Sequence, residues 1–243
     1  MPSSQSSFET RYGRFSSGTG LIQDITTYNP AKEIIKKANL TSFLAEAAVK
    51  DAKVNSTNTF YREKVKERRI NGFRDKDNLS NCLENRIRNI YSYVGAEFGH
   101  DSITYKKIKS FLDKIAPKYD KKDPGAPAGQ GKSPSEQSFV ALIGFGRRVG
   151  ELIDDLGVAY NPGNTDITLV ALGELCDMME TLTKDIAKAE IEWSKAVKAR
   201  KEIYDGKDGM TDRIKAIKDY LASFDLGKKS PDYINFCRIL AGR

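Results

Sequence analysis

The sequence predicts an all-α protein made of two tandem copies of a long-helix antiparallel bundle unit with coiled-coil-like packing. Three observations lead to this prediction. An internal repeat covers most of the chain, and apolar residues recur at steps of three and four over a long stretch of the second copy. The 8 prolines and 19 glycines are clustered, which leaves long stretches free of helix breakers.

The repeat begins with the triplet at residues 28–30, Tyr-Asn-Pro, which recurs at residues 160–162, 132 residues later. The same offset holds through the following segment, up to Arg68 and Arg200. Farther on the offset is 127, so that Tyr93 corresponds to Tyr220. These matches predict a first helical repeat with an N-terminal arm at residues 1–117, a Pro- and Gly-rich linker at 118–132, and a second helical repeat at 133–243.

The second copy shows each predicted helix in turn. Residues 139–156 have the apolar spacing of an amphipathic helix. A long helix is predicted over about residues 165–204, ended by two Asp-Gly pairs. A further helix begins at Met210, and Ser230 followed by Pro231 caps a short last one. The predicted apolar stripe of the long helix consists of Leu172, Leu175, Met179, Leu182, Ile186, Ala189, Trp193 and Val197.

The first copy follows the same plan less regularly. Its long helix has Lys50 and Thr57 on the stripe where the second copy has Leu182 and Ala189. The N-terminal segment contains Ser-Ser-Gly-Thr-Gly at residues 16–20, which predicts a broken helix or an extended arm. We expect the arm's aromatic side chains to find another surface, such as that of a neighbouring subunit. These candidate assembly residues are Phe8, Tyr12 and Phe15.

Basic residues gather at matching places in the two copies, at the end of each long helix and on the helix that follows. The net charge of +7 permits contact with nucleic acid or another acidic surface. Favourable placement of cations at helix C-termini explains part of the pattern without a ligand. The candidate basic contact surface consists of Lys66, Arg68, Arg69, Arg86, Arg88, Lys198, Arg200, Lys201, Arg213 and Lys215.

No catalytic constellation is visible in the sequence. The single histidine, His100, follows a glycine in a predicted surface turn, and a nucleophile–histidine pair would have to use it. The spacings of Cys, His and Glu match neither a zinc site nor a di-iron bundle. We therefore expect no enzyme activity, no cofactor, no metal and no small-molecule substrate.

The composition points to a cytoplasmic protein. Hydrophobic residues make up 39% and charged residues 30%, which is typical of a globular protein rather than a disordered one. The three cysteines, Cys82, Cys176 and Cys237, are widely spaced, as expected for free thiols in a reducing compartment. Neither a signal peptide nor an apolar run of about 20 residues is visible, so no membrane partner is expected.

The order of motifs resembles a family of uncharacterised bacterial proteins, mainly of Bacteroidetes type. The shared features are Tyr-Asn-Pro, a long helix ending in Ala-Arg or Glu-Arg, a basic helix with Tyr-Val or Tyr-Leu, and Ser-x-x-Tyr. Ser-Glu-Gln-Ser-Phe at residues 135–139 matches a further element of that family. The resemblance implies the duplicated helical architecture and carries no activity with it.

Together these features predict a non-enzymatic structural or interaction protein that associates with itself into an oligomer or filament, with polymerisation through the N-terminal arm. The alternative is a nucleic-acid-associated protein that uses the duplicated basic corners.

Overall fold

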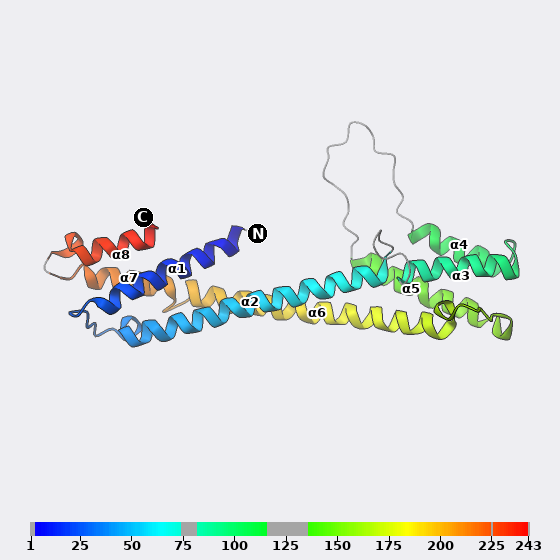
Figure 1. Cartoon of the computed structure of the whole chain (residues 1–243), viewed down its shortest axis with the longest axis horizontal. Helices are drawn as coiled ribbons and strands as arrows, with labels where there is room; N and C mark the ends of the chain where they lie inside the picture. The colour runs from blue at the N-terminus through cyan, green and yellow to red at the C-terminus, as the bar shows by residue number, and fades with distance from the viewer. Residues whose placement is uncertain (1–2, 74–81, 116–135, 225, 243) are drawn as a thin grey trace, which may run out of the picture. The chain divides into compact units, whose positions relative to one another are not determined.

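The computed structural model describes residues 3–73, 82–115, 136–224 and 226–242, which form helices and their connections with no β-strand among them (Figure 1). This confirms the predicted all-α class. The predicted linker at 118–132 lies outside the described residues.

The chain divides into two compact units whose boundaries differ from those of the sequence copies. Unit 1 comprises residues 1–60 and 189–243, and unit 2 comprises residues 61–188. Each unit therefore combines the first part of one copy with the last part of the other. Both boundaries lie within the long helices α2 (Lys37–Gly72) and α6 (Leu169–Asp205). At 1.5 Å per residue these helices are roughly 55 Å long, far longer than the short helices of the units, and each has residues in both units.

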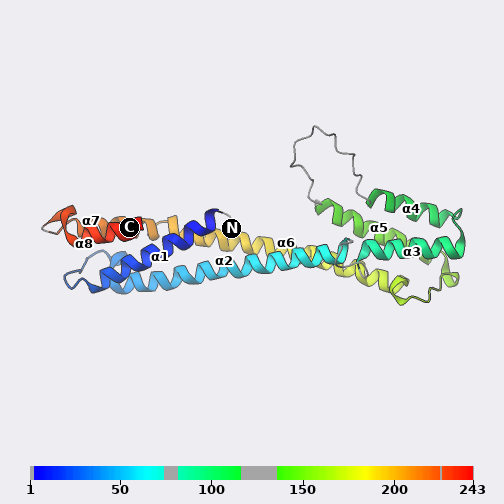
Figure 2. The same ribbon diagram turned by 45° about the horizontal axis from the view of Figure 1, so that its top comes forward.

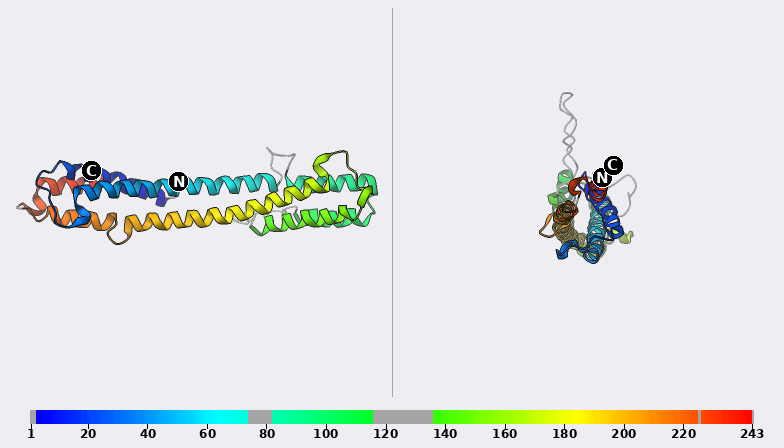
Figure 3. Two further views of the ribbon diagram at one scale, coloured as in Figure 1. Left: turned by 90° about the horizontal axis from the view of Figure 1, so that it is seen from below. Right: turned by 90° about the vertical axis from the view of Figure 1, so that its left-hand side faces the viewer.

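Unit 1 contains α1 (Ser3–Asp24), the 3₁₀ turn η1 (Glu33–Ile35), α7 (Met210–Leu221), η4 (Gly227–Lys229) and α8 (Pro231–Ala241). Helix α1 packs against α8, α8 against α7, and α7 against η1. The blue α1 and the red α8 lie side by side in Figure 3. The core draws on both ends of the chain and includes Phe15, Ile22, Tyr28, Ile35, Leu40, Phe43, Tyr204, Met210, Ile217, Leu221 and Phe236.

Unit 2 contains α3 (Leu83–Phe98), α4 (Ile103–Ile115), α5 (Glu136–Asp154), and the 3₁₀ turns η2 (Gly157–Ala159) and η3 (Thr165–Ile167). Helices α3, α4 and α5 pack against one another, and α3 also packs against η3 (Figure 2). Three of these contacts correspond to those of unit 1. The contacts of α5 with α4, α4 with α3, and α3 with η3 match those of α1 with α8, α8 with α7, and α7 with η1. The core includes Leu83, Ile87, Ile90, Val94, Ile108, Leu112, Phe139, Leu142, Val149, Ile153, Leu172, Leu175 and Met179.

Helix ends follow the residues that mark them in the sequence. The Ser230 side chain accepts a hydrogen bond from the backbone N–H of Tyr233 at 3.2 Å, and Pro231 occupies the first turn of α8. The turn between α6 and α7 needs glycine because a Cβ at Gly206 would lie 2.5 Å from the carbonyl oxygen of Glu202. The predicted boundaries near residues 204, 210 and 230 therefore agree with the structure.

The tyrosines of the two Tyr-Asn-Pro triplets make corresponding contacts. The Tyr28 hydroxyl donates to the carbonyl oxygen of Ile35 at 3.0 Å, and the Tyr160 hydroxyl donates to that of Ile167 at 2.6 Å. Burial raises the pKa of both phenols well above the usual value. In unit 1 the Tyr28 ring packs edge-to-face on Tyr220, 5.0 Å between centroids, and in unit 2 the Tyr160 ring packs on Tyr93 at 5.2 Å. Each pair joins one copy to the other.

The predicted apolar stripe of α6 is correct for most of its length. Its members from Leu172 to Ala189 are buried. The prediction is wrong at the far end, where Trp193 is half-buried and Val197 is exposed, while Ala196 and Arg200 are buried instead. A helix with 3.6 residues per turn drifts relative to a seven-residue repeat, so the buried face moves around the helix.

The predicted break in the N-terminal segment is wrong, because α1 is one continuous helix from Ser3 to Asp24. Gly18 lies where the ring of Phe236 from α8 approaches the helix, and a Cβ there would be 2.8 Å from a ring carbon. This contact gives the glycine a packing role that offsets its poor helix propensity.

We expect Gly18→Ala and Gly20→Ala to change stability in opposite directions. A methyl at Gly18 would displace the fully buried Phe236, whereas a Cβ at Gly20 meets nothing within 4 Å. The second change should stabilise unit 1 by about 0.5–1 kcal/mol through helix propensity, and the first should destabilise it by about 1–3 kcal/mol. Urea denaturation followed by fluorescence of Trp193, the one tryptophan of the chain, measures both. Equal effects of the two changes would contradict this packing role.

Candidate functional site

The ten residues of the predicted basic surface are divided evenly between the units. Lys66, Arg68, Arg69, Arg86 and Arg88 belong to unit 2, and Lys198, Arg200, Lys201, Arg213 and Lys215 belong to unit 1. Each group comes from the end of one long helix and the short helix after it, as the sequence predicted.

Two of these arginines are buried against aromatic rings. Arg200 is 6% exposed, with its guanidinium carbon 4.3 Å from the ring centroid of Phe8. Arg68 is 5% exposed, with its guanidinium carbon 4.3 Å from the centroid of Phe139. A cation over an aromatic face is a favourable contact, and here it ties the end of a long helix to α1 or α5.

Three further arginines are held by partners in the fold. Arg86 donates to the carbonyl oxygen of Ala171 at 2.7 Å. Arg213 donates to the carbonyl oxygen of Ile34 and lies over the ring of Phe43, and burial lowers the pKa of its guanidinium. Arg88 forms an ion pair with Glu84 at 2.8 Å. The remaining basic residues, Lys66, Arg69, Lys198, Lys201 and Lys215, are exposed.

The three predicted assembly residues lie on α1 within unit 1. Phe15 is fully buried and packs edge-to-face on Phe43, 5.9 Å between centroids. Phe8 packs edge-to-face on Tyr204 at 4.8 Å, and Tyr12 is half-buried beside the same core. Phe8 thus packs on a residue of the second copy, whereas Phe15 packs on a residue of its own copy, and both contacts lie within the same chain.

A polar network joins α1, α2 and α6 in unit 1. The Tyr204 hydroxyl donates to Asp51 at 2.6 Å, and the Arg200 Nε lies 4.0 Å from the same carboxylate without a hydrogen bond. Arg11 donates to Asp205 at 2.7 Å and thereby lowers the pKa of that carboxyl group. The network joins the helices through the two hydrogen bonds and the ion pair, while Asp51 Oδ1 and Arg200 Nε have no hydrogen-bond partner in the described part of the chain.

Among the described residues of unit 2, this network has no counterpart. The residue 132 positions after Asp51 is Thr183, and the residue 132 positions before Tyr204 is Gly72. In the described part of unit 2, the Nε and Nη1 atoms of Arg68 are buried and have no hydrogen-bond partner. Arg200 therefore lies beside a carboxylate, that of Asp51, whereas in unit 2 the position that matches Asp51 is occupied by Thr183.

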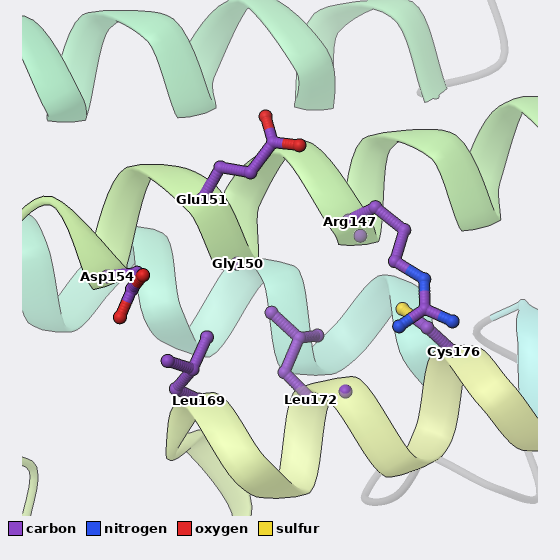
Figure 4. A pocket seen from close by; sticks show the side chains of 9 residues that line it. Arg147, Gly150, Glu151, Asp154, Leu169, Leu172 and Cys176 are labelled. Atoms are coloured by element: carbon purple, nitrogen blue, oxygen red, sulfur yellow. The ribbon is translucent and has the colours of Figure 1, made fainter.

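A hollow of about 270 Å³ lies between α5 and the first turns of α6 in unit 2 (Figure 4). Leu169 and Leu172 rise from α6 toward α5, and Gly146, Gly150 and Gly173 leave the space between the helices open. The exposed carboxylates of Glu151 and Asp154 stand at its edge. Sequence reasoning missed this hollow, and the small residues of α5 and α6 are the signal that could have found it.

The remaining chemically active side chains are dispersed. His100 is an exposed turn residue whose ring packs on Tyr105, which agrees with the sequence interpretation. Cys82 and Cys176 are buried free thiols, and burial raises the pKa of Cys176 to about 11, whereas Cys237 is only partly buried. Among the described residues, no group of three or more His, Cys, Asp or Glu side chains is arranged to hold a metal ion.

Comparison of the chain with protein-family models, curated proteins and solved structures finds no match. The resemblance to the bacterial family therefore stays a prediction. In the described ranges, no helix combines the length and the apolar character that a membrane span requires.

Proposed function

We propose that this chain is a duplicated, non-enzymatic helical scaffold that associates with further copies of itself. The observation that carries the proposal is the exposure of large aliphatic side chains on short, hydrogen-bonded connections. In unit 1, Leu226 is 65% exposed on the connection between α7 and α8, and in unit 2, Val158 is 102% exposed in η2. Ile103, the first residue of α4, is also 73% exposed. An apolar side chain held on an ordered turn can enter the apolar core of an interface at little cost in conformational freedom.

The buried polar residues support the same proposal. Tyr28, Tyr160, Tyr204 and Arg86 donate hydrogen bonds to carbonyl oxygens or a carboxylate inside each unit. Such contacts hold helices in place and stiffen the surfaces between them. A stiff helical unit loses little conformational freedom when it associates, which favours assembly.

The arm residues Phe8 and Phe15 pack inside unit 1. We therefore propose that the contact between copies lies outside the N-terminal arm. Deleting residues 2–19 would remove Phe15 from the core. We therefore expect loss of folding in unit 1 rather than a folded protein that no longer assembles.

Sedimentation velocity over a wide range of protein concentration tests the proposal. We expect the average mass to rise with concentration in a reversible manner. A chain that remains monomeric up to millimolar concentration would exclude self-association as its function.

The alternative, a nucleic-acid-associated protein, rests on the exposed basic residues of each unit, such as Lys198 and Lys201 one turn apart on α6. Binding through such residues would come from counterion release and would be weak and steeply salt-dependent. Titration with duplex and single-stranded oligonucleotides at two salt concentrations decides the matter. Tight, sequence-selective binding at high salt would place this alternative above self-association.

A further inference from the structure

The hollow of unit 2 has an apolar floor and an acidic edge. Leu172 and Cys176 are buried at its base, and Leu169 is 38% exposed on one side. Glu151 and Asp154 are exposed at the edge. The volume of about 270 Å³ is below the roughly 300–1,000 Å³ of most small-molecule pockets, so the hollow suits a few protein side chains better.

The charge around the hollow is negative although the whole chain has a net charge of +7. Among the described residues that line it, the one cation is Arg147. It donates to Asp177 and to Glu180, and these hydrogen bonds raise the pKa of its guanidinium. The carboxylates of Glu151 and Asp154 therefore face solvent without neutralisation by Arg147. An occupant with positive charge beside an apolar group would complement this surface.

The connection between α7 and α8 presents such a group on unit 1. Leu226 is 65% exposed, and Lys228 and Lys229 follow it, both exposed. Asp225, the residue before Leu226, lies outside the described residues. The next acid along the chain, Asp232, is half-buried.

The turn is held in shape by its own backbone. The N–H of Lys229 donates to the carbonyl oxygen of Leu226 at 3.0 Å, and the N–H of Ser230 donates to that of Gly227 at 3.0 Å. Gly227 has φ 54°, in the left-handed region that favours glycine. A turn that is ordered before binding loses little freedom when it docks.

We propose that the Leu226–Lys229 turn of one copy docks into the α5–α6 hollow of a second copy, with Leu226 on the apolar floor and Lys228 and Lys229 beside Glu151 and Asp154. This inference rests on the proposed self-association and names the two surfaces that meet. Because the surfaces differ, the contact is heterologous, and repeated contacts build either a ring or an open filament.

Charge reversal on each surface tests the pairing. One variant carries Lys228→Glu and Lys229→Glu, a second carries Glu151→Lys and Asp154→Lys, and a third carries all four changes. We expect each two-residue variant to associate about tenfold or more weakly than the native chain, because like charges then meet. The four-residue variant should regain association to within about threefold of the native chain, because the charges are again opposite. Sedimentation velocity at low salt measures all four proteins, and circular dichroism checks their folding.

A change inside the hollow provides a test that does not depend on charge. A Cβ at Gly150 would lie in ordinary contact with Leu169 at 3.6 Å, so Gly150→Ala narrows the hollow without disturbing the fold. The matched control is Gly144→Ala, because Gly144 also lies on α5, its Cβ would meet nothing within 4 Å, and it does not line the hollow. We expect only Gly150→Ala to weaken association, by about tenfold.

The outcomes separate this inference from the proposed function. A native chain that never associates would overturn both. If the native chain associates and both two-residue variants associate as strongly as it does, the docking site alone would be overturned. Loss of association in both two-residue variants without recovery in the four-residue variant would show that the two surfaces are not partners, and would overturn the pairing.

Discussion

Separate production of residues 1–117 and 133–243 is expected to yield two fragments that cannot fold as monomers. Each fragment holds only part of each core. The first contains Phe15 and Leu40 of unit 1 but lacks Tyr204, Ile217 and Phe236. The loss should amount to the whole free energy of unfolding, about 5–15 kcal/mol for a domain of this size.

Co-expression of the two fragments should restore the missing contacts. We expect a one-to-one complex with a cooperative thermal transition by circular dichroism, whereas each fragment alone should show none as a monomer. A fragment that folds only as a homodimer would also agree with this expectation, because a second fragment molecule would supply helices that match the missing ones. Cooperative melting of either fragment as a monomer would contradict the division into units.

The second large effect is expected from Asp51 in unit 1. Asp51→Ala removes the carboxylate that lies 4.0 Å from Arg200 and accepts a hydrogen bond from Tyr204. Because Arg200 is 6% exposed, its charge would remain buried without an anion, and we expect a loss of about 3 kcal/mol. Asp51→Asn keeps an acceptor for Tyr204 and should cost less, about 1–2 kcal/mol, which separates the charge from the hydrogen bond.

The matched arginine of unit 2 is the control for this reasoning. Arg68 already has a buried guanidinium with two nitrogen atoms that lack partners. Replacement by Met keeps an apolar stem over Phe139 and removes the unpaired charge. We therefore expect Arg68→Met to be neutral or stabilising by about 1 kcal/mol. Urea denaturation followed by circular dichroism measures both arginine sites, and a cost below about 1 kcal/mol for Asp51→Ala would contradict the role of the ion pair.

Much of the helical framework could be predicted from local signals. Ser230 with Pro231 marks the start of α8, and the Asp-Gly pairs mark the end of α6, because caps and turns depend on neighbouring residues. The stripe from Leu172 to Ala189 follows from helical periodicity. The hydrogen bonds of the two Tyr-Asn-Pro tyrosines to Ile35 and Ile167 could not be predicted, because they depend on how the chain turns after each triplet.

The candidate sites were less accessible to sequence reasoning. Arg68 and Arg200 belong to the predicted basic surface because basic residues gather at matching places in the two copies. Only the position of Phe139 and Phe8 over them explains their burial. Likewise, the hollow at Gly146 and Gly150 depends on which helix lies opposite α5. A sequence pattern records which face of a helix is apolar and does not record what packs against it.

The sequence by itself determined that this protein is helical and where most of its helices begin and end, and it predicts which positions of its two halves correspond. The tertiary structure decided that α1 is continuous, because Phe236 packs against Gly18. It also decided that each compact unit joins the first part of one copy to the last part of the other. Two similar copies present similar apolar faces, so periodicity cannot distinguish a helix's own copy from the other one. That choice depends on the geometry of the long helices and on contacts between residues far apart in the chain.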